Sequence, residues 1–107
     1  MVLSAEQMVT SIESINENIV TDFSLKQNYP NPFNPATTIE FSLLNNSKVV
    51  LTVYNVLGQK VKELLNAELK QGVYHIDLNA EHLSSGLYFY ELKSEGQSKI
   101  LKMSLIK

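Results

Sequence analysis

The chain contains 107 residues and carries a formal net charge of −2, with 44% hydrophobic and 19% charged residues. This length suffices for one domain whose core needs no covalent staples, and the composition is that of a globular rather than a disordered chain. The interspersed charges leave no basic patch for a nucleic acid, and no apolar run is long enough to span a bilayer. The absence of cysteine excludes a disulfide framework and a cysteine nucleophile.

Residues 1–22 carry the weakest pattern of the chain. Met8, Ile12, Ile15 and Ile19 lie at helical spacing, but polar residues interrupt them, and short isolated helices are marginal in water. We therefore expect a linker with frayed helical turns, and an amphipathic helix that docks on a partner is the alternative. The segment lacks the basic and apolar regions of a secretory signal, so we expect any export signal to lie elsewhere.

All three prolines of the chain fall within residues 27–35. Proline fixes its own φ, lacks an N–H and pushes the preceding residue toward extended geometry, so this run can be neither a helix nor a central strand. We expect a stiff extended connector that leads into a β domain. Tyr29 and Phe33 are the apolar groups expected to hold it against that domain.

From residue 23 onward, short runs of β-forming residues alternate between apolar and polar and are separated by turn signals. Residues 48–56 are the most β-branched and are apolar on both faces, which predicts a central strand. Gly58 permits a tight reversal after it, followed by a weaker strand and a loop at 67–72. The expected strands are 23–25, 37–44, 48–56, 60–66, 73–79, 87–94 and 98–107.

Short strands without intervening helices predict an all-β fold, namely a seven-stranded immunoglobulin-like β-sandwich after a short N-terminal linker or helical segment. Leu83 is expected beneath the corner at 80–86. Gly86 followed by Tyr88 is similar to the tyrosine corner of immunoglobulin-like folds, where a tyrosine hydroxyl bonds to nearby backbone. The residues expected to face the core are Ile39, Phe41, Leu43, Val49, Leu51, Val53, Tyr74, Ile76, Leu78, Tyr88, Tyr90, Leu92, Leu101, Met103 and Leu105.

Groups that could carry chemistry are sparse. His75 and Asp77 share one strand face, and His82 lies in a loop, but two histidines without cysteine disfavour zinc, and we expect a solvated pair. No serine lies in a Gly-x-Ser-x-Gly elbow, and each glycine stands alone at a turn, which disfavours a phosphate loop. We expect no enzyme, cofactor or small-molecule substrate. Tyr54 and Phe89 are expected to cover the sheet face, with a sugar platform as the alternative.

Four stretches together carry a family resemblance. They are Gln-Asn-Tyr-Pro-Asn-Pro-Phe-Asn-Pro at 27–35, Val-Tyr-Asn-Val-Leu-Gly-Gln-Lys-Val at 53–61, Ser-Ser-Gly-Leu-Tyr-Phe-Tyr-Glu-Leu at 84–92, and the closing residues 99–107. In this order they resemble the C-terminal sorting domain, type A, of proteins exported by the type IX (Por) secretion system. The resemblance covers residues 23–107, and the architecture is also similar to the immunoglobulin-like domain of the flagellar hook-capping protein.

The resemblance implies a non-catalytic address label on a larger cargo protein, which passes from the periplasm through the type IX translocon to the outer-membrane surface or the extracellular space. It also implies a sortase-like cysteine peptidase that removes the domain and attaches the cargo to a surface anchor. The resemblance places the sorting signal at Gly96, Lys99, Lys102, Met103, Leu105 and Lys107. The family motif falls on Tyr29, Pro30, Asn31, Pro32, Phe33, Gly58, Gly86 and Tyr88.

The last strand suggests how such a signal is recognised. At a sheet edge its unpaired N–H and C=O groups can add to a receptor's sheet, with Lys99 and Lys102 supplying selectivity by charge. This hypothesis predicts that removing residues 105–107 abolishes sorting and leaves most of the fold intact. The same edge could join two copies of the chain into a homodimer. The alternative function is an immunoglobulin-like adhesive or assembly module that stays on the mature protein.

Overall fold

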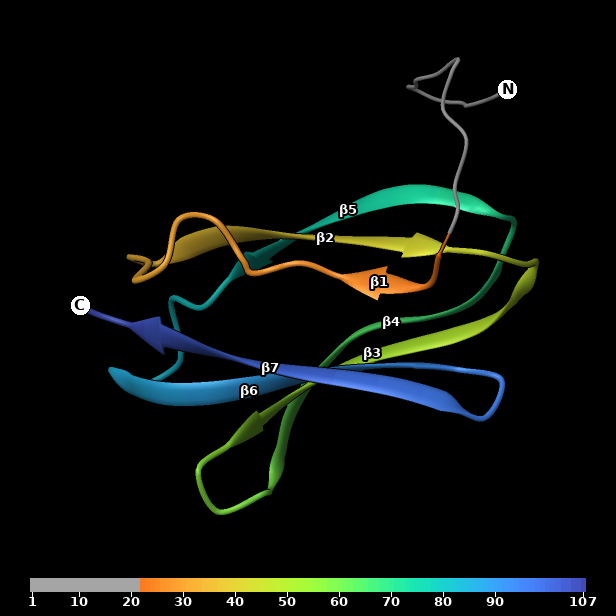
Figure 1. Cartoon of the computed structure of the whole chain (residues 1–107). Coiled ribbons are helices and arrows are strands. Elements are labelled where there is room, and N and C mark those ends of the chain that lie inside the picture. The colour runs from red at the N-terminus through yellow and green to blue at the C-terminus, as the bar shows by residue number, and fades with distance from the viewer. Residues whose placement is uncertain (1–21) are drawn as a thin grey trace.

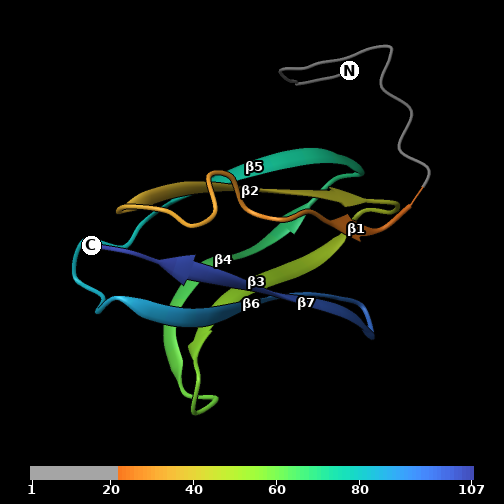
Figure 2. The same ribbon diagram turned by 60° about the vertical axis from the view of Figure 1, so that its left-hand side comes forward.

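The computed structural model of the chain describes residues 22–107, so the linker or helix expected at residues 1–22 lies outside this range except for its last residue. The described part is all-β, and it contains no helix that could cross a membrane. Seven strands form two antiparallel sheets that face each other as layers (Figures 1 and 2). The strands are β1 (Ser24–Leu25), β2 (Ala36–Leu43), β3 (Ser47–Asn55), β4 (Lys60–Leu69), β5 (Gly72–Asn79), β6 (Gly86–Ser94) and β7 (Gln97–Leu105).

The strand order explains which strands are central. One sheet has the order β1-β2-β5 and the other has the order β4-β3-β6-β7, so β3 is central, as its two apolar faces predicted. The loop expected at 67–72 is confirmed only for residues 70 and 71, because β4 continues to Leu69, where it pairs with Ser47 of β3, and β5 begins at Gly72. Pairing with a long neighbouring strand supplied an extended conformation that the local sequence did not indicate.

The core lies between the sheets and is built by alternation along the strands. Most of the predicted inward residues are buried, whereas Tyr74, Ile76 and Leu101 are half-buried and pack against the margin of the core. Leu83 also packs against the core from the corner before β6. The buried apolar residues are Phe33, Ile39, Phe41, Leu43, Val49, Leu51, Val53, Leu78, Ala80, Tyr88, Tyr90, Leu92, Met103 and Leu105.

Two turns require a left-handed backbone. The β6–β7 hairpin closes through Glu95 with φ of 43° and Gly96 with φ of 80°, the pattern of a two-residue turn with positive φ at both central positions. Gly58, with φ of 81°, reverses the chain between β3 and β4 as predicted. There the Asn55 side-chain oxygen accepts the N–H groups of Leu57 and Gln59 at 2.9 and 3.0 Å.

Candidate functional site at the last strand

Among the strands that the structure describes, the last one, β7, lies at an edge of the four-stranded sheet and has β6 as its only neighbouring strand. In an antiparallel pair, alternate residues direct their N–H and C=O groups toward the partner or away from it. The even-numbered residues of β7 point away from β6, because Ser104 makes its backbone bonds on the other side. Their side chains also face outward, since Leu101, Met103 and Leu105 face the core.

A proline-containing segment covers the C-terminal half of this edge. Residues 27–34, which we call the strap, connect β1 to β2 and pass beside the end of β7 (Figures 1 and 2). The Ser104 N–H donates to the Asn31 side-chain oxygen at 3.0 Å, and the Phe33 N–H donates to the Ser104 carbonyl at 2.9 Å. The Ile106 N–H then donates to the Phe33 carbonyl at 3.0 Å. The strap therefore acts as a short parallel partner for the end of the last strand.

The N-terminal half of the same edge is open. Gln27 donates its side-chain amide to the Lys102 carbonyl at 2.8 Å, and this bond is the boundary of the strap's cover. Within residues 22–107, no group bonds to the outward N–H and C=O of Ser98 or Ile100. The edge of β7 is therefore divided at Lys102 into a covered half and an open half.

The strap is held in place by a buried amide and a buried ring. Asn28, which is 2% exposed, donates its side-chain amide to the Pro30 carbonyl and to the Thr37 hydroxyl, both at 3.0 Å. The Thr37 hydroxyl donates in turn to the Pro30 carbonyl at 2.9 Å. Phe33, which is 1% exposed, inserts into the core between the sheets. These contacts fix the strap from both of its ends.

The hydroxyl of Tyr90 connects the strap to β6. It accepts the Asn28 N–H and donates to the Lys26 carbonyl, both at 2.8 Å, so both of its hydrogen-bonding roles are filled. Burial raises the pKa of Tyr90 to about 12, partly offset by the hydrogen bond from Asn28, so this phenol is neutral at physiological pH. Tyr90 thereby links the two sheets beside the start of the strap.

One of the two expected anchors of the strap was wrong. Phe33 is buried, but Tyr29 is 81% exposed and does not hold the strap to the domain. Its N–H and C=O instead pair with Thr38, a half-buried residue whose hydroxyl bonds at the surface to Asp77. Residues directly opposite in an antiparallel pair share one face, so the Tyr29 side chain follows Thr38 to the outside.

The six residues expected to carry the sorting signal differ in burial. Met103 and Leu105 are 1% and 2% exposed, so in the folded domain they pack in the core and offer no surface to a partner. Leu105 also lies opposite Phe33 of the strap. Removing residues 105–107 would therefore take out a core side chain and the bond between Ile106 and the strap, so the truncation expected to leave most of the fold intact is not a clean test of recognition.

The remaining signal candidates are exposed. Gly96 lies in the β6–β7 turn, and the Lys99 ammonium lies 5.9 Å from the centre of the Phe23 ring. Lys107 bonds through its ammonium to the Glu81 carbonyl. Within residues 22–107, neither Lys99 nor Lys102 forms an ion pair.

Other motif residues have structural surroundings. Pro30 and Asn31 belong to the strap network, and Pro32 is exposed on the strap. Gly86 begins β6 opposite Leu105. The Tyr88 hydroxyl donates to the carbonyl of residue 84 at 2.6 Å, which is the return to nearby backbone that the sequence suggested.

The histidine pair expected on β5 is divided between two partners. His75 lies 3.1 Å from a carboxylate oxygen of Glu40 on β2, and Asp77 accepts the Thr38 hydroxyl at 2.8 Å. These side chains are solvated on the outside of the three-stranded sheet. Among the residues that the structure describes, no three metal-binding side chains gather into a cluster.

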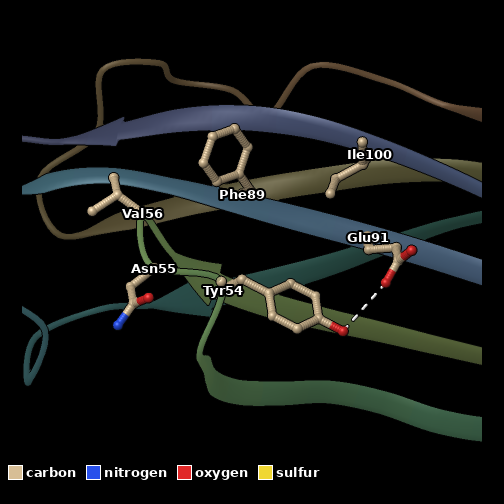
Figure 3. Close-up of a pocket in the computed structure, with 7 residues that line it drawn as sticks. Tyr54, Asn55, Val56, Phe89, Glu91 and Ile100 are labelled. Carbon is tan, nitrogen blue, oxygen red and sulfur yellow. Dashed lines mark hydrogen bonds between the residues drawn. The ribbon is translucent and has the colours of Figure 1, made fainter.

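The outer face of the four-stranded sheet bears a shallow groove (Figure 3), lined in part by Tyr54 and Phe89, the two aromatic residues expected to cover this face. The Tyr54 hydroxyl donates to Glu91 at 3.2 Å at one end of the groove. Ile100, which is 55% exposed, comes from β7, and its place among the outward even-numbered residues of that strand was the available signal. The groove holds about 260 Å³ and is lined by Tyr54, Asn55, Val56, Gly58, Phe89, Glu91 and Ile100.

Comparison with known protein families gives a match that includes both the strap and β7. The secretion system C-terminal sorting domain matches residues 27–107, from the first residue of the strap through the end of β7. The chain therefore belongs to the C-terminal sorting domain family of the type IX (Por) secretion system. Among curated proteins, none matches the chain significantly. Membership implies interaction with the type IX secretion machinery and export across the outer membrane to the surface or the extracellular space.

Proposed function

We propose that the chain is the non-catalytic sorting signal of a larger cargo protein and that the type IX translocon recognises it as a folded domain after transit through the periplasm. The observation that carries this proposal is the bonding between strap and last strand. The family match begins at the strap and ends with β7, and these two segments, distant in sequence, bond to each other through Asn31, Phe33 and Ser104. The shared motif thus builds one surface.

In this proposal the signal candidates have different roles. Met103 and Leu105 anchor β7 in the core, and the strap holds the end of that strand. Lys99 and Lys102 remain exposed beside the open half of the edge, where their charge can select a partner. An edge strand that is rigidly held at one end offers backbone groups without the entropic cost of ordering a loose tail.

The immunoglobulin-like class and the removal of the domain belong to the same proposal. The bond from Tyr88 to the backbone of residue 84 supports an immunoglobulin-like sandwich, in which such a corner occurs. Family membership supports removal by a sortase-like cysteine peptidase and attachment of the cargo to a surface anchor, as for type A domains.

A retained adhesive or assembly module is the second candidate. The groove on the outer face of the four-stranded sheet favours it, because a partly exposed apolar hollow is what a binding module would use. The two functions differ in the fate of the domain. A sorting signal of this type is absent from the mature surface protein, whereas an adhesive module persists there.

The test uses a fluorescent protein with a periplasmic targeting signal fused before residues 1–107, expressed in a type IX host and in the same host without the translocon. Mass spectrometry then determines whether the fluorescent protein reaches the surface and whether the domain is still attached. Surface delivery that requires the translocon, with the domain removed, is expected. Retention in the periplasm of both strains would contradict sorting, and surface delivery with the domain attached would favour the retained module.

A matched pair of variants tests the assigned surface. Lys99→Gln with Lys102→Gln removes exposed charges beside the edge of β7 and should lower surface delivery without unfolding the domain. Lys48→Gln with Lys62→Gln removes the same number of exposed charges from β3 and β4 and should leave delivery unchanged. Equal effects of the two pairs would show that only net charge matters and would contradict recognition at β7.

A further inference from the structure

The open half of the β7 edge is a ready template for another strand. Ser98 and Ile100 direct N–H and C=O groups away from β6, and nothing in residues 22–107 bonds to them, whereas the strap occupies the edge from Lys102 onward. A row of unpaired backbone groups on an edge strand favours pairing with an extended chain. The space between the β6–β7 turn and the strap limits such a partner to a short segment.

The groove of Figure 3 lies on the same face as the side chains of this open half. Ile100 belongs to both features, because its backbone points to the free edge while its side chain lines the groove beside Phe89. In a strand added to the edge, alternate side chains would lie next to Ile100 on the outer face. Apolar residues at those positions would extend the contact with the groove and remove apolar surface from water.

The charge around the edge indicates what the other side chains of that strand should be. Residues 97–107 contain three lysines and no aspartate or glutamate. Lys99 lies within the open half, with its side chain on the face opposite to that of Ile100, and Lys102 lies at the boundary with the strap. Within residues 22–107, neither lysine forms an ion pair. In an added strand whose apolar residues face Ile100, the intervening residues face Lys99, so acidic residues at those positions would be attracted to its ammonium. A second copy of the chain would instead bring the same lysines together, which disfavours a homodimer at this edge.

We propose that residues 98–101 of β7 bind, as an added antiparallel strand, an extended segment of a partner protein in which apolar residues alternate with acidic ones. The apolar side chains rest against Ile100 and the groove on the outer face, and the acidic side chains lie on the opposite face, where they pair with Lys99. The place of this partner in secretion rests on the proposed sorting function, but the binding itself does not require the translocon.

Nuclear magnetic resonance of the isotope-labelled full chain tests the proposal, with a short peptide of alternating valine and glutamate as the probe. Binding should slow hydrogen exchange at the amides of Ser98 and Ile100 and shift the resonances of Phe89, which lines the groove. A matched peptide with lysine in place of glutamate should bind far more weakly. No binding of the glutamate peptide, equal binding of the two peptides, or shifts centred on β4 would each overturn the proposal.

Two variants of Ser98 separate the loss of its backbone N–H from the loss of its side chain. The Ser98 N–H points away from β6, so Ser98→Pro removes a donor for the added strand without removing a bond of the β6–β7 ladder. It should weaken peptide binding about two- to tenfold, the range expected for one hydrogen bond. Ser98→Ala keeps the N–H and should bind as the wild type does. Equal affinities for the two variants, both shown to be folded by circular dichroism, would overturn strand addition.

Sedimentation and the secretion assay complete the test. The free chain should sediment as a monomer, and a dimer dissociated by Ser98→Pro would assign the edge to a second copy and overturn the proposal. The Ser98→Pro fusion should also be exported less than the Ser98→Ala fusion. Export of both at the wild-type level would show that the translocon does not use this edge, which overturns the inferred role while leaving sorting by the domain intact.

Discussion

Replacing Tyr90 with phenylalanine tests the bond that ties the strap to β6. The tyrosine is fully buried, and its hydroxyl accepts the Asn28 N–H and donates to the Lys26 carbonyl at 2.8 Å each. Phenylalanine retains the ring and creates almost no cavity, so the substitution removes these two hydrogen bonds and little else. Both backbone groups then lose their partner.

The size of the stability loss depends on how well water can reach the Asn28 N–H and the Lys26 carbonyl. Leaving a buried donor without a partner costs about 1–3 kcal/mol, and Asn28 is only 2% exposed, so water does not replace the hydroxyl there. Lys26 is exposed, and water near its carbonyl can offset part of the second loss. We expect Tyr90→Phe to lower the free energy of unfolding by about 2 kcal/mol.

Urea unfolding followed by circular dichroism measures this change, and Tyr88→Phe is the control. The Tyr88 hydroxyl makes a single bond, to the carbonyl of exposed Ser84, so its loss should cost only about 0.5–1 kcal/mol. Hydrogen exchange provides a second readout, because the Asn28 amide should exchange faster in Tyr90→Phe than its lower global stability explains. The reasoning is refuted if Tyr90→Phe costs no more than Tyr88→Phe.

Three further predictions concern the strap, the last hairpin and alkaline stability. Phe33→Ala should lower the free energy of unfolding by about 3–5 kcal/mol because it leaves a cavity in the core, and Tyr29→Ala should lower it by less than about 0.5 kcal/mol. Equal effects of the two variants in thermal unfolding would contradict Phe33 as the anchor of the strap. Gly96→Ala, at φ of 80°, should lower the free energy of unfolding in urea by about 1–2 kcal/mol, whereas Glu95→Asn, at φ of 43°, should raise it. Changes of the opposite sign would contradict the turn assignment. Burial raises the pKa of Tyr90 from 10.0 to about 12 in the folded protein. The unfolded chain therefore loses this proton at a lower pH than the folded one, so the contribution of the Tyr90 phenol to stability is complete below pH 10 and is lost as the pH rises to about 12. Urea unfolding at several pH values should show that Tyr90→Phe lacks this part of the decline, and parallel declines would contradict it.

Much of the fold could be predicted from the sequence because strand formation leaves a local pattern. Side chains alternate between the two faces of a strand, so Ile39, Phe41 and Leu43 identified their buried face without any knowledge of their neighbours. The turns at Gly58 and Gly96 were visible for the same reason, since left-handed backbone selects residue types directly. Seven strands and most of the core followed from these local signals.

The candidate site was predicted only in outline. The sequence indicated that the proline segment and the last strand matter together, but their contacts join residues that lie far apart in the chain. The bond between Asn31 and Ser104 spans 73 positions, and that between Asn28 and Tyr90 spans 62. No local pattern indicates such a pairing, and for this reason the exposure of Tyr29 was also missed.

The sequence by itself determined the alternation that makes strands, the turns that separate them and the apolar set that forms the core, because each depends on residues within a few positions of one another. Only the tertiary structure decided that β7 is an edge strand, that the strap covers its end, and that nothing in the described part of the chain bonds to the outward backbone groups of Ser98 and Ile100. The physical reason is that backbone N–H and C=O groups are alike in every residue but proline, so the sequence does not encode which of them is left unpaired until the sheets assemble.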